Sequence, residues 1–200
     1  GHDSFESAFE EFGDFETKKQ WKGSPRLAAA ISHKAVSEQI PLQIISNDKL
    51  DHGSSIPLYH LSEPLPHISV LPIGYSTLSR EKHLSLGVLL KDVFLNSPKR
   101  IAVIASGDLS HTLTDASPGG YHASGEMFDS SLQVLLKQSN SDGIIHMDEN
   151  MLAQAQECAY KSLLILLGII KNMHYSFENL CYEAPLGVGY LSGIFHLSAR

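Results

Sequence analysis

The stretch Asp48-Lys49-Leu50-Asp51-His52-Gly53-Ser54-Ser55-Ile56-Pro57-Leu58 places an acidic residue and a histidine soon after an apolar run at 42–46. That run predicts a β-strand. A second apolar run, 100–106, leads in the same way into Gly107-Asp108-Leu109-Ser110-His111. In α/β proteins, ligands and metals gather just past the carboxyl ends of strands. Two junctions of strand, aspartate and histidine therefore predict a functional site.

Composition limits what that site can be. The 200 residues are 42% hydrophobic and 18% charged, which predicts a single globular domain over residues 1–200. The formal charge of -7 argues against nucleic acid as a partner, because binding phosphates needs clustered Lys and Arg. No apolar run reaches membrane-spanning length and no signal peptide opens the sequence, so we expect a cytoplasmic protein. Cys158 and Cys181 follow no zinc-ribbon spacing and are interpreted as reduced core thiols.

Helical and strand-like segments alternate along the chain. This alternation predicts an α/β fold, with a central mixed sheet flanked by helices in one layered domain. The run Leu163–Ile170 is apolar on every face, which predicts a helix inside the protein. Gly187 and Gly189 predict a close approach of the backbone to another group. The expected helices are 24–39, 55–61, 79–94, 124–138 and 149–172, and the expected strands are 42–46, 66–74, 101–105 and 191–197.

Glu157 is predicted to lie partly buried, where the helix 149–172 enters the interior. An ionised carboxylate there needs a partner, and both a metal ion and an ion pair with Lys161 at i+4 satisfy that need. Two histidines and one carboxylate make the ligand set of open non-heme Fe(II) sites. His52 and Glu157 are therefore candidate ligands.

Other polar residues of the two junctions have candidate supporting roles. Asp51 and Asp108 are expected to orient the ligands or the substrate. If His111 does not bind the metal, it is a candidate acid/base group, because imidazole is the side chain that ordinarily changes charge near neutral pH. His67, at the end of the expected strand 66–74, is a candidate pocket residue, although a packing role fits it as well.

Four motifs together resemble the class III extradiol ring-cleavage dioxygenase superfamily, and within it the AmmeMemoRadiSam system protein B and Memo-like branch. The similarity covers about residue 10 to the end of the chain. The motifs are Leu50-Asp51-His52-Gly53 with Pro57-Leu58, Ala105-Ser106-Gly107-Asp108-Leu109-Ser110-His111, Gln156-Glu157-Cys158, and Tyr182-Glu183-Ala184-Pro185-Leu186-Gly187-Val188-Gly189-Tyr190.

The resemblance implies a mononuclear non-heme Fe(II), with O2 as co-substrate and a small aromatic diol as substrate. It assigns metal ligation to His52 and Glu157, and acid/base catalysis to His111. The family's first ligand is a histidine in a His-Pro type motif near the N-terminus, and this sequence has no such motif before residue 30. Either the chain is a fragment without the family's first strand and first ligand, or the protein has lost that ligand, and we expect a fragment.

One fold in this superfamily supports several functions. A non-enzymatic accessory protein that binds Zn or Cu is a second hypothesis, and a metal-dependent hydrolase is a third. The sequence decides neither the substrate nor whether the protein forms a homo-oligomer.

Overall fold

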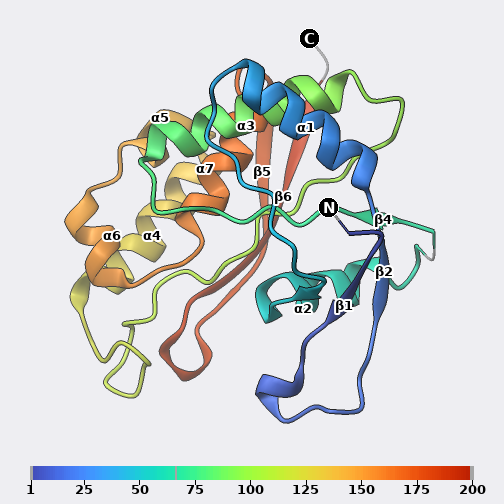
Figure 1. The fold of residues 1–200 in the computed structure, drawn as a ribbon. Coiled ribbons are helices and arrows are strands. Elements are labelled where there is room, and N and C mark those ends of the chain that lie inside the picture. Colours follow the sequence, from blue (N-terminus) through green and yellow to red (C-terminus); the bar gives the residue numbers. More distant parts are fainter. Residues whose placement is uncertain (1, 66, 199–200) are drawn as a thin grey trace. The chain divides into compact units, whose positions relative to one another are not determined.

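The computed structural model describes residues 2–65 and 67–198 and consists of two compact units (Figure 1). Unit 1 comprises Gly1–Thr77 and Leu89–Ala102, and unit 2 comprises Leu78–Val88 and Val103–Arg200. Helix α3 (Arg80–Leu95) contributes residues to both units. None of the helices in the described ranges is both long enough and apolar enough to span a bilayer.

A small mixed sheet forms the core of unit 1. Its strand order is β3-β1-β2-β4, in which β1 and β2 are antiparallel while β3 and β4 run parallel to their neighbours. Phe5 pairs with Trp21 across β1 and β2, and both side chains are buried together with Leu50 and Val70. The strands are β1 (Ser4–Ser7), β2 (Gln20–Gly23), β3 (Lys49–Leu50) and β4 (Ser69–Val70).

Two further helices belong to unit 1, α1 (Pro25–Ser37) and α2 (His52–Ser62). Helix α2 packs on the sheet, because Trp21 donates its indole N–H to Ser62 Oγ at 2.8 Å and Leu58 packs against the buried cluster. Unit 1 therefore buries a small core between the sheet and α2.

Unit 2 contains the remaining helices and a long antiparallel hairpin with a register shift between Asn179 and Cys181. The predicted burial of Leu163–Ile170 is confirmed, because α7 is buried over nearly its whole length. The elements are α3 (Arg80–Leu95), α4 (Ala123–Lys137), α5 (Ser141–Ile145), α6 (Glu149–Ala155), α7 (Tyr160–Ile169), β5 (His174–Glu183) and β6 (Tyr190–Ser198), with short 3-10 helices at Glu10–Phe12 in unit 1 and Pro185–Gly187 in unit 2.

The α/β class is confirmed, and so are the expected helices 24–39, 55–61, 79–94 and 124–138 and the strand 191–197, apart from small differences at their ends. The predicted strands 42–46 and 101–105 are wrong, because neither segment forms a strand. Ile45 is 70% exposed and Ile104 is 46% exposed. An apolar run becomes a strand only where a neighbouring strand accepts its backbone hydrogen bonds, and composition does not reveal that neighbour.

Two further predictions need correction. Of the expected strand 66–74 only β4 forms, and Pro66 lies outside the described residues. The single helix expected over 149–172 is two helices, α6 and α7, because Gln156 adopts a left-handed conformation with φ of 52°. This break creates a connecting segment that becomes part of the candidate site.

Candidate functional site

The loop Asp108–His111 lies in unit 2 against the segment that connects α6 to α7. The Asp108 carbonyl accepts hydrogen bonds from the backbone N–H groups of Cys158 and Ala159, both at 3.1 Å. The His111 N–H donates to the Ala155 carbonyl at 2.9 Å. Both ends of the loop are therefore held by the connection between the two helices.

The opposite side of this loop contacts the turn before β6. The Leu109 N–H donates to the Gly189 carbonyl, and the Gly189 N–H donates to the Ser110 carbonyl, both at 2.8 Å. A Cβ atom at Gly189 would overlap Asp129, and one at Gly187 would overlap Ser117. The predicted close approach at both glycines is confirmed, and it allows the turn to pair with the loop.

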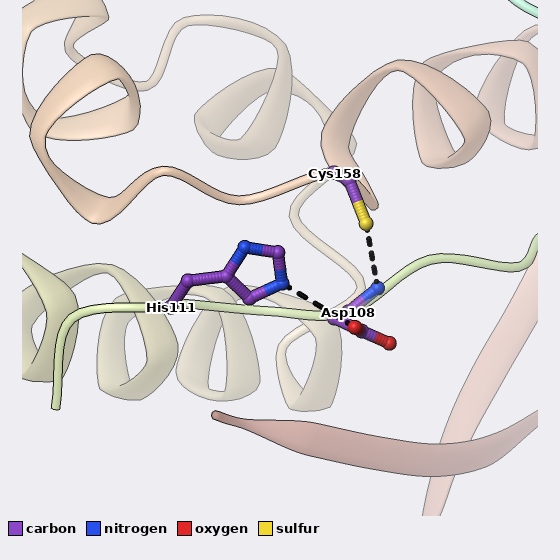
Figure 2. A group of neighbouring side chains, drawn as sticks. All are labelled: Asp108, His111 and Cys158. Atoms are coloured by element: carbon purple, nitrogen blue, oxygen red, sulfur yellow. Dashed lines mark hydrogen bonds and ion pairs between the residues drawn. The ribbon is translucent and has the colours of Figure 1, made fainter. Parts of the chain in front are cut away.

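Three side chains converge where the loop meets the helix connection: Asp108, His111 and Cys158 (Figure 2). His111 Nε2 lies 3.3 Å from Asp108 Oδ2, and the two side chains are 25% and 34% exposed. The backbone N–H of Asp108 donates to Cys158 Sγ at 3.1 Å. One donor atom from each residue lies within 4.8 Å of the other two.

The donor set fits a divalent transition metal. Imidazole nitrogen, carboxylate oxygen and thiolate sulfur are all ligands of Zn, Cu and Fe in proteins. Burial is the main cause that raises the pKa of the Cys158 thiol, and the negative charges of Asp108 and Glu157 raise it further, while its hydrogen bond from the Asp108 N–H opposes the shift. The thiol is therefore neutral in the metal-free protein, and a bound metal would displace its proton.

The family model for the catalytic LigB subunit of aromatic ring-opening dioxygenase matches residues 1–192. The chain belongs to this family. It is also 31% identical over 206 residues to Protein CA_C1420 of Clostridium acetobutylicum, an alignment that covers 98% of this chain and 44% of the relative. The chain thus spans less than half the length of that relative.

Glu157, a metal ligand by family resemblance, is partly buried as expected. Its Oε2 accepts the backbone N–H of Tyr160 at 2.6 Å, at the start of α7. Burial is the main cause that raises the pKa of Glu157, opposed by the Tyr160 N–H and by the charges of Lys161 and His111. The carboxylate therefore stabilises the start of α7, and a positive charge on His111 lowers the pKa of Glu157.

The remaining site residues that the sequence predicts belong to unit 1. Asp51 caps α2, since its Oδ1 accepts the Ser54 N–H at 2.9 Å. His52 begins α2 and its ring meets the edge of the Phe12 ring at 5.2 Å between centroids. His67 is exposed in a turn before β4. A metal site shared by His52 and Glu157 therefore remains a prediction, while Asp108 and His111 do lie together.

Cys158 is the site residue that sequence reasoning assigned to the core. Its position directly after Glu157, a candidate ligand, was the signal available in the sequence. Because a thiolate is a ligand of transition metals, a cysteine beside a candidate ligand is itself a candidate.

Proposed function

We propose that this member of the ring-opening dioxygenase family is a non-heme Fe(II)-dependent extradiol-type dioxygenase, which opens a catechol-type ring with O2. The observation that carries the proposal is the partly exposed pair of His111 and Asp108, 3.3 Å apart, in a chain that matches the family over residues 1–192.

His111 is the acid/base residue in this proposal. When Nε2–H donates to Asp108 Oδ2, Nδ1 is left as the acceptor for a phenolic proton of the substrate. The Asp108 carboxylate then stabilises the positive charge that His111 gains. Because a carboxylate fixes both the tautomer and the orientation of an imidazole, Asp108 keeps Nδ1 of His111 available to accept that proton.

His52 and Glu157 are the proposed ligands of the metal, with Asp51 and His67 near the substrate. A bound Fe(II) ion would lower the pKa of the diol hydroxyls and supply the redox chemistry with O2. A positively charged metal ion would stabilise the ionised form of the partly buried Glu157 side chain, so Glu157 is suited to metal ligation.

The test is oxygen uptake with a panel of catechols after anaerobic loading with Fe(II). Uptake by the wild-type protein that requires both Fe(II) and a vicinal diol supports the proposal. If hydroquinone, in which the hydroxyls are not adjacent, supports the same uptake, the extradiol assignment is wrong. Hydrolysis of ester or amide substrates without oxygen would favour a hydrolase instead.

Cys158 favours a second candidate function, a metal-binding accessory protein. In this alternative Asp108, His111 and Cys158 themselves hold Zn or Cu, since a thiolate suits both metals. The variant Cys158→Ala separates the two functions, with Cys181→Ala as the matched control because Cys181 is also a free cysteine. Loss of zinc affinity in Cys158→Ala alone supports the accessory function, whereas unchanged Fe(II)-dependent oxygen uptake in Cys158→Ala supports the dioxygenase.

A further inference from the structure

We infer that Asp129 and Tyr182 are positioning residues, which fix the loop Asp108–His111 in the geometry that brings its two polar side chains to Cys158. The inference rests on the proposed function in one respect, namely that the loop carries the functional side chains Asp108 and His111. The side chains that carry it come from α4 and β5, and Asp129 lies outside the four motifs.

Asp129 is deeply buried although it is a carboxylate. It lies on α4, is 2% exposed, and is the only acidic residue among the buried polar residues in the described part of the chain. Its Oδ1 accepts the backbone N–H of Ser110 at 2.9 Å, and its Oδ2 accepts the hydroxyl of Tyr182 at 2.7 Å. Neither partner is a cation, so the carboxylate does not form a buried salt bridge with them.

The bond to Ser110 reaches the middle of the candidate site. Ser110 stands between Asp108 and His111, its N–H is held by Asp129, and its carbonyl is held by the Gly189 N–H at 2.8 Å. Both peptide groups of Ser110 are thus fixed by hydrogen bonds. A rotation of either one would move the two site side chains relative to each other.

Tyr182 fixes Asp129 in turn. A buried carboxylate with a single hydrogen bond would be free to rotate about its χ2 angle, but the Tyr182 hydroxyl holds the second oxygen. A Cβ at Gly189 would overlap Asp129 Oδ2, so Gly189 must remain a glycine for Asp129 to reach Ser110. The arrangement links α4, β5 and the turn before β6 to one peptide group of the site.

A retained buried carboxylate is costly when an apolar side chain of the same volume would pack as well. The cost is understandable here because both oxygens of the Asp129 carboxyl group are used, one for the loop backbone and one for Tyr182. The distribution of contacts therefore points to control of loop geometry rather than to general stability.

The test compares Tyr182→Phe with Tyr175→Phe in the whole chain. Both residues lie on β5 and each substitution removes one hydroxyl hydrogen bond, since the Tyr175 hydroxyl bonds to Ser141 Oγ at 2.7 Å. The first readout is amide hydrogen exchange of Ser110 in metal-free protein, with the amide of Leu164 in α7 as reference. The second readout is the zinc dissociation constant, measured by competition with a chromophoric chelator.

Tyr182→Phe is expected to speed Ser110 exchange by about tenfold, which is the loss of one hydrogen bond to a charged acceptor. It is also expected to weaken zinc binding by about 10-fold to 100-fold, as loss of supporting contacts around metal sites does. Tyr175→Phe should change neither. Asp129→Asn keeps an acceptor for the Ser110 N–H, so it should restore most of the protection that Asp129→Ala loses.

Equal effects of the two tyrosine variants on Ser110 exchange and on zinc binding would overturn the inference, because both would then report general destabilisation. Wild-type protein that binds neither zinc nor Fe(II) would defeat the proposed function alone. The exchange of Ser110 would still decide the positioning role in that case.

Discussion

Two junctions with the same residue types, Asp51-His52 in unit 1 and Asp108-Leu109-Ser110-His111 in unit 2, use their carboxylates differently. Asp51 is adjacent to its histidine and accepts the Ser54 N–H as the cap of α2. Asp108 is three residues from its histidine and lies 3.3 Å from the His111 ring. Asp51 thus serves the backbone at the start of α2, whereas Asp108 lies beside an imidazole.

The two junctions are expected to differ most in the effects of replacing their histidines. His111→Ala is expected to lower Fe(II)-dependent oxygen uptake by about 10²-fold to 10⁴-fold, the usual contribution of a general acid/base group, while Fe(II) still binds. His52→Ala is expected to abolish Fe(II) binding instead. Anaerobic titration followed by oxygen electrode measurements would separate the two outcomes. His196→Ala is the control, because that histidine is exposed and its ring pairs with Glu178.

If His111→Ala lost Fe(II) and kept its activity per bound metal, His111 would be a ligand rather than the base. The comparison would then reverse, since the unit 2 junction would hold the metal.

The aspartates should differ in stability. Asp51→Ala is expected to lower the free energy of unfolding by about 1 kcal/mol, because it removes a helix cap, whereas Asp51→Asn keeps the cap acceptor and should be nearly neutral. Asp108→Asn should lower activity with a smaller effect on stability. Urea unfolding monitored by Trp21 fluorescence measures the unit 1 effect, since Trp21 lies in the core beside α2. An Asp51→Ala variant as stable as the wild type would show that the cap contributes nothing.

Glu157 gives the smallest predicted effect, which depends on pH. Burial raises the pKa of Glu157 above its ordinary value of 4.5, so the native state holds this proton more tightly than the unfolded state. Its contribution to stability is therefore largest below pH 4.5 and falls as pH rises through the folded-state pKa. Metal-free Glu157→Gln should gain stability relative to the wild type as pH increases across that window, measured by urea unfolding at several pH values. A stability difference that is independent of pH would contradict the raised pKa.

The sequence predicted parts of the fold that depend on local pattern. The run Leu163–Ile169 is apolar on every face, which predicted a buried helix, and α7 is buried. The paired strands β1 and β2 went unrecognised because the acidic N-terminal segment has no strand pattern, and their stability comes from the contact of Phe5 with Trp21. The predictions for 42–46 and 101–105 were wrong in the opposite sense, because strands were predicted there and none formed. Apolar composition does not show whether a neighbouring strand is present.

The candidate site was predicted in the same uneven way. Asp108 and His111 were found because both follow one apolar run closely in the sequence. Cys158 is 50 residues from Asp108 and reaches it only because the helix expected over 149–172 breaks at Gln156. The hydrophobic periodicity of the sequence does not predict that break. It depends on the left-handed conformation of Gln156 and on the Glu157 carboxylate, which accepts the Tyr160 N–H at the start of α7.

The contacts of the loop Asp108–His111 also have a consequence for the order of folding. The loop forms hydrogen bonds with Cys158, which is 50 residues downstream of Asp108, and with Gly189. Asp129 accepts a hydrogen bond from Tyr182, which is 53 residues further along the chain. Closing such long loops delays the formation of contacts. On a ribosome the cluster cannot assemble until Gly189 has been synthesised and has left the exit tunnel. A metal ion held by this cluster would therefore bind late in the maturation of the protein, because a nascent chain halted before the final hairpin would have all three donor side chains without the contacts that bring them together.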